Sequence, residues 1–170
     1  VDVTESVIDE ALSLDANLVV SHHPLLFHPL RQLVDADFTQ RIVRRALLAG
    51  ISLYAAHTNL DSAAGGMSFR LGKQLGLTAM RVLSPHRDGA ETGFGVVGDL
   101  PEAIPVSGFL QQVKSVLRCG AIRHSELCRE QVRRVALVTG AGASMLGDAV
   151  AAGADIYLTA DMKYNDFYAP

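Results

Sequence analysis

The sequence has few cysteines and no long apolar run, and each absence excludes a class of protein. Cys119 and Cys128 stand nine positions apart without a Cys-x-x-Cys pair, which indicates reduced thiols; a disulfide between them is the alternative. No apolar run approaches the ~20 residues that a membrane-spanning helix needs, and no basic-then-apolar leader opens the chain at Val1. We therefore expect a soluble, cytoplasmic protein with no membrane segment.

Concentrated charge is also missing. The formal net charge is −3, and the 15 basic residues are scattered except for short pairs such as Arg44–Arg45. A nucleic-acid-binding surface needs clustered lysine and arginine, so no nucleic-acid partner is expected. A chain of 170 residues with 49% hydrophobic content is instead large enough to bury one sizeable core.

A helix followed by a strand is predicted three times. In each case a residue able to cap a helix precedes apolar residues at helical spacing, and a short apolar strand follows. The caps and strands are Thr4 before 18–20, Asp37 before 51–56, and Ser144 before 156–158. Further elements are a helix over 66–75, a strand over 94–97, a helix after Pro105 and a strand over 135–138. Alternation of helices and strands predicts an α/β fold, with duplicated strand-helix units forming a mixed, largely parallel sheet flanked by helices.

The first and third units match weakly when the sequence is shifted by 138 positions, which places Leu18 on Ile156 and His23 on Asp161. We interpret residues 1–170 as one domain of two pseudo-repeated halves, about 1–80 and 90–170. The third unit follows the strand at 135–138, whereas only Val1 to Val3 precede the first. The repeat therefore predicts a further strand before Val1, and the sequence is expected to be a fragment of a longer chain.

Histidines follow the first two of these strands. Ser21-His22-His23-Pro24 closes one, and His57-Thr58-Asn59-Leu60-Asp61 closes the next. Ligands of such sheets collect at the carboxyl ends of strands, and imidazole with carboxylate suits zinc, iron, manganese or nickel. Two titratable rings beside an apolar strand are costly in free energy unless a partner binds them. No residue of opposite charge adjoins the doublet in the sequence to serve as that partner. The pattern indicates a metal site, and the alternative is that these are ordinary surface or hydrogen-bonded histidines. That ordinary interpretation is the one that fits His28, His86 and His124.

Polar residues near the C-terminus are weaker candidates. Asp161 follows the third strand and matches His23 in the repeat, and Lys163, Tyr164 and Asn165 are polar enough to line a pocket or to form a solvated loop. The Gly140–Gly142 segment lacks a third glycine and a P-loop lysine, so a tight turn is favoured over an anion-binding loop. Ser21 beside His22 is not a serine-hydrolase pair, because the Gly-x-Ser-x-Gly elbow is absent.

The motifs together resemble the Nif-three-like family (NGG-one-interacting factor three-like), whose members are often labelled GTP cyclohydrolase I type 2 homologues. The motifs that carry the resemblance are Ser21-His22-His23-Pro24-Leu25-Leu26-Phe27, His57-Thr58-Asn59-Leu60-Asp61, Gly93-Phe94-Gly95-Val96-Val97-Gly98 and Leu158-Thr159-Ala160-Asp161-Met162-Lys163-Tyr164. The resemblance implies two divalent metal ions per chain, with His22 and His23 each binding metal and Asp61 coordinating or bridging both. It also implies a nearby His57, our candidate for proton transfer, and a homohexameric assembly.

Two features depart from the family pattern. The family's C-terminal Gly-His-x-x-(Ser/Thr)-Glu motif, which supplies the remaining histidine and glutamate ligands, is not found in the sequence, and Asn165 stands where many members have histidine. Two functions are consistent with these residues. One is a metal-dependent hydrolase acting on a small cyclic amide, nucleotide or phosphate-like substrate. The alternative is a non-catalytic metal-binding or regulatory scaffold.

Overall fold

The computed structural model describes residues 1–87 and 89–168 and divides into two compact units, Val1–Leu60 and Asp61–Pro170. The division falls earlier in the chain than the halves suggested by the repeat, and the duplication itself stays a prediction. Among the described residues, the helices are too short or too polar for any of them to span a bilayer.

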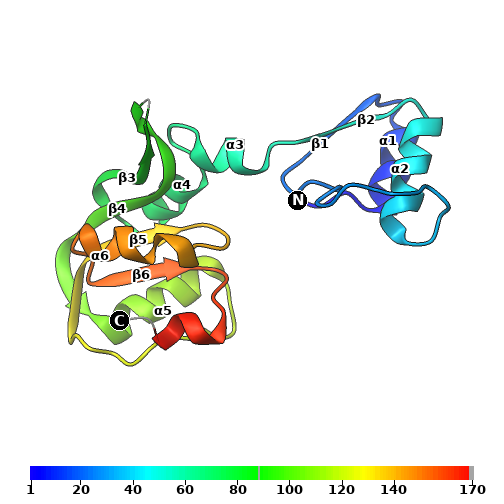
Figure 1. Cartoon of the computed structure of the whole chain (residues 1–170). Coiled ribbons are helices and arrows are strands. Elements are labelled where there is room, and N and C mark those ends of the chain that lie inside the picture. Colours follow the sequence, from blue (N-terminus) through cyan, green and yellow to red (C-terminus); the bar gives the residue numbers. More distant parts are fainter. Residues whose placement is uncertain (88, 169–170) are drawn as a thin grey trace. The chain divides into compact units, whose positions relative to one another are not determined.

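The first unit packs two helices on a small parallel sheet (Figure 1). Its helices are α1 (Glu5–Ser13) and α2 (Phe38–Leu48), and its strands are β1 (Leu18–Ser21) and β2 (Ser52–Ala55). Two of the three predicted caps are confirmed: Thr4 Oγ1 accepts from the Val7 amide at 3.3 Å, and Asp37 Oδ1 accepts from the Gln40 amide at 2.8 Å. Gln40 Nε2 donates back to Asp37 Oδ2 at 3.1 Å, so the side chains of these two residues also bond each other.

The sheet of this unit has one covered and one exposed face. Val19 and Leu53 pack against the helices, whereas Leu18, Val20 and Tyr54 on the opposite face are 52%, 63% and 52% exposed. The alternation follows from the two-residue period of a strand. The buried core consists of Val3, Ile8, Ala11, Ile42, Ala46 and Ile51.

The second unit contains a four-stranded sheet in the order β3-β4-β5-β6. The strands are β3 (Thr78–His86), β4 (Gly89–Pro105), β5 (Gln131–Val138) and β6 (Ile156–Thr159). The β3–β4 and β4–β5 pairs are antiparallel and the β5–β6 pair is parallel. The helices are α4 (Met67–Gln74), α5 (Val106–Leu117) and α6 (Leu146–Ala151), with 3-10 turns at Ala143–Met145 and Tyr164–Tyr168. The α/β class with a mixed sheet and flanking helices is confirmed, and its strands are divided between two sheets.

Helices cover both faces of this larger sheet. Alternate residues of β5 belong to different clusters: Val135 and Leu137 pack with Phe109 of α5, whereas Ala136 and Val138 pack with Ala149 of α6. The sheet is therefore buried on both sides, as the near-continuous apolar sequence of β5 requires.

The same turn ends four of the helices and leads into a strand. A residue with left-handed φ follows each helix, and an amide bonds the carbonyl five residues earlier, the 6→1 bond of the Schellman motif. The left-handed residues are Asp15, Gly50, Gly76 and Gly153, and the bonds are Ala16→Ala11, Ile51→Ala46, Leu77→Gly72 and Ala154→Ala149, of 2.9 to 3.1 Å. The 138-residue shift places α1 on 143–151 and β1 on β6, so local structure repeats at the spacing that the sequence suggested.

Candidate metal centre

The histidine doublet lies immediately after β1 and is anchored through its backbone. The carbonyl of Val1 accepts hydrogen bonds from the amides of both His22 and His23, each 3.1 Å long. Ser21 Oγ donates to the His23 carbonyl at 2.8 Å. The start of the chain and the end of β1 therefore hold the doublet in one conformation.

His57 is brought beside the doublet by the parallel pairing of β1 and β2. The pairing continues past both strands, because the Ala56 amide donates to the Ser21 carbonyl and the His57 amide to the His22 carbonyl, both at 2.9 Å. His57 opens helix α3 (His57–Ser62) with φ of +33°, a region that side chains other than glycine rarely adopt. Such backbone strain costs on the order of 1–3 kcal/mol and is often found at functional sites.

The three imidazoles form a compact cluster. Ring centroids are 5.1 Å apart for His22 and His23, 5.7 Å for His22 and His57, and 6.0 Å for His23 and His57. For comparison, Zn–N bonds of about 2.0–2.1 Å put the ring centres of histidines around one tetrahedral ion roughly 5 Å apart. The cluster thus has the donor type and approximate spacing of a metal site.

Among the described residues, the cluster does not form a complete metal site. Within residues 1–87 and 89–168, no group of three or more histidine, cysteine, aspartate or glutamate side chains is arranged to hold a metal ion. The ring planes of the three pairs are inclined by 55° to 81°.

Asp61 lies four residues after His57, in the last turn of α3, where the first compact unit gives way to the second. Residues four apart share a face of an α-helix. This placement does not by itself test whether Asp61 binds metal. The role of Asp61 stays a prediction, as do the ligand roles of His22 and His23.

Asp2 contacts the histidine cluster but was not predicted as a site residue from the sequence. Its Oδ1 lies 2.7 Å from Nδ1 of His23, so the doublet does have a partner of opposite charge, 21 positions away in the chain. The expectation that no such residue adjoins the doublet holds only along the sequence. The sequence carried only a weak signal of this contact. It required that the residues just before the Thr4 cap lie beside the end of β1.

The C-terminal candidates lie in the second unit, and their side chains are exposed. Asp161, Lys163, Tyr164 and Asn165 occupy the segment after β6, where the Lys163 amide donates to Asp166 Oδ2 at 2.9 Å and forms a local turn. A cavity of about 750 Å³ is present in this unit, between α5, the 119–130 segment and β6. Its lining includes sequence neighbours of the candidates, among them Thr159, Ala160, Met162, Asp166 and Phe167, besides residues of α5, α6 and the 119–130 segment. A role of the four predicted residues in substrate binding stays a prediction.

The glycine turn before α6 is closed by side chains of β6. Thr159 Oγ1 donates to the Gly140 carbonyl at 2.8 Å and accepts from the Gly142 amide at 3.0 Å. Tyr157 donates its hydroxyl to the Gly142 carbonyl at 2.6 Å, and burial raises the pKa of Tyr157 to about 12. Because Thr159 occupies the Gly142 amide, the contacts support the tight-turn interpretation rather than an anion-binding loop.

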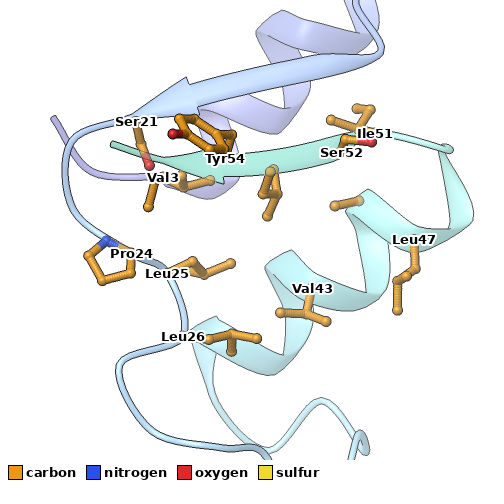
Figure 2. A pocket seen from close by; sticks show the side chains of 13 residues that line it. Val3, Ser21, Pro24, Leu25, Leu26, Val43, Leu47, Ile51, Ser52 and Tyr54 are labelled. Carbon is orange, nitrogen blue, oxygen red and sulfur yellow. The ribbon is translucent and has the colours of Figure 1, made fainter. Parts of the chain in front are cut away.

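A largely apolar cavity of about 540 Å³ borders the doublet in the first unit. Figure 2 shows it between the two strands, the segment around Pro24 to Leu26, and α2 with Val43 and Leu47. Ser21 and Pro24, which flank the doublet in sequence, both line this cavity. A small ligand held there would lie next to the segment that carries His22 and His23.

Comparison with known proteins identifies the family. A model of the family Duf34/NIF3 (NGG1p interacting factor 3) matches residues 1–169. A "GTP cyclohydrolase 1 type 2 homolog" of Clostridium perfringens is 33% identical over 164 residues, covering 96% of this chain and 63% of its own length. "NIF3-like protein 1" of Drosophila melanogaster is 29% identical over 170 residues, covering 97% of this chain and 56% of its own.

Among solved structures, a Bacillus cereus protein related to NIF3 has a TM-score of 0.87 at 24% identity, covering 99% of this chain and 73% of that one. This likeness supports the fold, and the family model and sequence relatives support the kinship. The chain spans less than two thirds of the length of the two sequence relatives named above. The chain belongs to the Duf34/NIF3 family.

Proposed function

We propose that this protein binds two divalent metal ions through His22, His23 and Asp61 and uses them to hydrolyse a small molecule. The observation that carries the proposal is the clustering of His22, His23 and His57, which places three imidazoles within 6.0 Å of one another where two parallel strands end. Titratable rings concentrated where α/β sheets bind ligands are typical of a metal site.

The chain's own residues have distinct parts in this proposal. His22 and His23 supply neutral nitrogen donors, and Asp61 supplies the carboxylate that offsets the charge of two cations. Divalent ions at such a site supply Lewis acidity, which polarises a substrate oxygen and activates water as a nucleophile. His57 accepts or returns a proton at a ring nitrogen.

The substrate class follows from the surroundings of the site and from the names of relatives. The cavity beside the doublet accepts an apolar group of modest size. Sequence relatives carry the name "GTP cyclohydrolase 1 type 2 homolog", so purine nucleotides join cyclic amides and phosphate-like compounds as candidates. We also propose homohexameric self-association, for which the exposed apolar face of Leu18, Val20 and Tyr54 offers contact area.

An activity assay with defined metal content tests the proposal. Protein stripped with a chelator and reloaded with zinc, iron, manganese or nickel is incubated with GTP, other nucleotides and cyclic amides. We expect turnover that disappears on stripping, returns on reloading and is abolished in His22→Ala but retained in His86→Ala, an exposed histidine of β3. Metal binding without turnover would instead support a scaffold, and absence of metal binding would contradict the proposal.

A further inference from the structure

Asp2 contacts the cluster through a hydrogen bond that belongs to none of the sequence motifs. Its Oδ1 lies 2.7 Å from Nδ1 of His23, while the two side chains are 65% and 50% exposed, respectively. We propose that Asp2 is a positioning residue: its carboxylate fixes the ring of His23 so that Nε2 is the nitrogen presented to a metal ion. This inference rests on the proposed metal site and adds to it a residue that sets ligand geometry.

The backbone around Asp2 is held on both sides. The Val1 carbonyl bonds the amides of His22 and His23, and the side chain of Val3 is 5% exposed within the core of the first unit. Thr4 then caps α1. A residue fixed between such neighbours loses little additional freedom when its side chain bonds a partner, so the contact with His23 is favoured over a mobile surface pair.

The chemistry of the pair determines which nitrogen is left. An ionised carboxylate only accepts hydrogen bonds, so the Nδ1 that contacts Asp2 carries the ring proton. The remaining nitrogen, Nε2, keeps its lone pair and faces away from the carboxylate. Histidines that bind metals commonly donate their other ring N–H to a carboxylate in this way, which orients the ring and increases its basicity.

An ordinary surface ion pair is the competing explanation, and it makes different predictions. Exposed pairs contribute roughly 0–1 kcal/mol to stability and have no bearing on metal affinity. Asp9 offers a matched control, because it pairs with Arg45 between α1 and α2 and its side chain is 64% exposed, almost as much as that of Asp2. Removing either carboxylate removes one exposed ion pair of the same unit, but only Asp2 contacts the cluster.

The test compares Asp2→Ala, Asp2→Asn and Asp9→Ala by two measurements. Two-bond proton–nitrogen correlation spectra of metal-free protein at alkaline pH report which nitrogen of His23 carries the proton. Zinc and cobalt titrations report affinity. We expect the Nδ1–H tautomer in the wild type and in Asp9→Ala, a shift towards Nε2–H in Asp2→Ala, and affinity lowered roughly 10–100-fold in Asp2→Ala. Asp2→Asn, which keeps one acceptor oxygen but no charge, should lie between.

The outcomes separate this inference from the metal site itself. If the wild type binds no metal, the proposed site is wrong, whatever the tautomer of His23. If the wild type binds metal and Asp2→Ala binds it as tightly as Asp9→Ala does, the positioning role is overturned even if the tautomer changes. An affinity loss with an unchanged tautomer would also overturn it, because Asp2 would then act other than through the His23 hydrogen bond.

Discussion

Removing the carboxylate of Asp155 should loosen the start of β6 from β5. Asp155 Oδ2 accepts hydrogen bonds from the amides of Arg133 and Arg134, at 3.0 and 2.9 Å. Burial acts to raise the pKa of Asp155, but these two bonds and the charges of Arg129 and Arg134 outweigh it and hold the pKa below its ordinary 3.8. The ionised form is therefore the one that stabilises the fold.

The size of the effect follows from the two bonds. A hydrogen bond to a charged group contributes about 1.5–3 kcal/mol when buried, and the Asp155 side chain is 21% exposed, which lets water replace part of the loss. We expect Asp155→Ala to lower the free energy of unfolding by about 2–3 kcal/mol at pH 7. Asp155→Asn keeps one oxygen acceptor and should lose about half as much.

Urea unfolding between pH 3 and 7 measures this, and amide exchange at Arg133 and Arg134 reports it locally. Because the folded pKa is depressed, the stabilisation is present above the unfolded pKa and is lost as pH falls through the folded value. The difference between the wild type and Asp155→Ala should therefore shrink below about pH 4. Glu102→Gln, which removes an exposed carboxylate of β4, is the control. A difference independent of pH, or exchange unchanged at both amides, would refute the reasoning.

Two further predictions concern β4 and β6. Gly95 has φ of +69°, and a Cβ there would lie 2.6 Å from Cγ2 of Val138, so Gly95→Ala should cost roughly 1–3 kcal/mol in thermal or urea unfolding; full wild-type stability would contradict the packing described. Burial raises the pKa of Tyr157 to about 12. The protonated hydroxyl of Tyr157 therefore contributes to the free energy of unfolding below pH 10, and this contribution is lost as pH rises towards 12. The free energy of unfolding should therefore fall less between pH 8 and pH 11 in Tyr157→Phe than in the wild type. An equal fall in both proteins would contradict this prediction.

Local structure followed closely from the sequence because capping and strand-ending residues act over a few positions. The caps at Thr4 and Asp37 were readable from residue type and spacing, and two of the left-handed turns into the next strands use glycine, at Gly50 and Gly153, the residue that such turns favour. The third predicted cap differs in detail: Ser144 lies within the 3-10 turn that precedes α6, and no side-chain hydrogen bond caps that helix.

Pairing between strands was less predictable because it depends on contacts distant in sequence. The sequence predicted a strand within β4 but none at β3, and it did not show the direction of pairing. The β3–β4 and β4–β5 pairs are both antiparallel, in a sheet that was expected to be largely parallel. The 17-residue length of β4 also exceeds the strand predicted over 94–97. Periodicity locates strands but carries no information on which neighbour each one chooses.

The candidate site shows the same division. His22, His23 and His57 were identified because they follow two strands predicted to run in parallel, and the structure brings their rings together. Asp2 was missed, because its contact with His23 depends on how the chain before α1 returns to the end of β1. A single sequence shows which residues follow a strand, whereas the path of the preceding segment is settled by packing.

Metal stoichiometry tests the central claim most directly. Stripped protein is titrated with zinc or manganese, dialysed and measured by elemental analysis, with His22→Ala, His23→Ala and Asp61→Asn beside the wild type and His124→Ala as control. The account predicts two ions per chain in the wild type and in His124→Ala, metal lost from both histidine variants, and one ion in Asp61→Asn, because a neutral amide no longer offsets the repulsion between two cations. Metal content in the His22→Ala and His23→Ala proteins equal to that of the wild type would contradict the account.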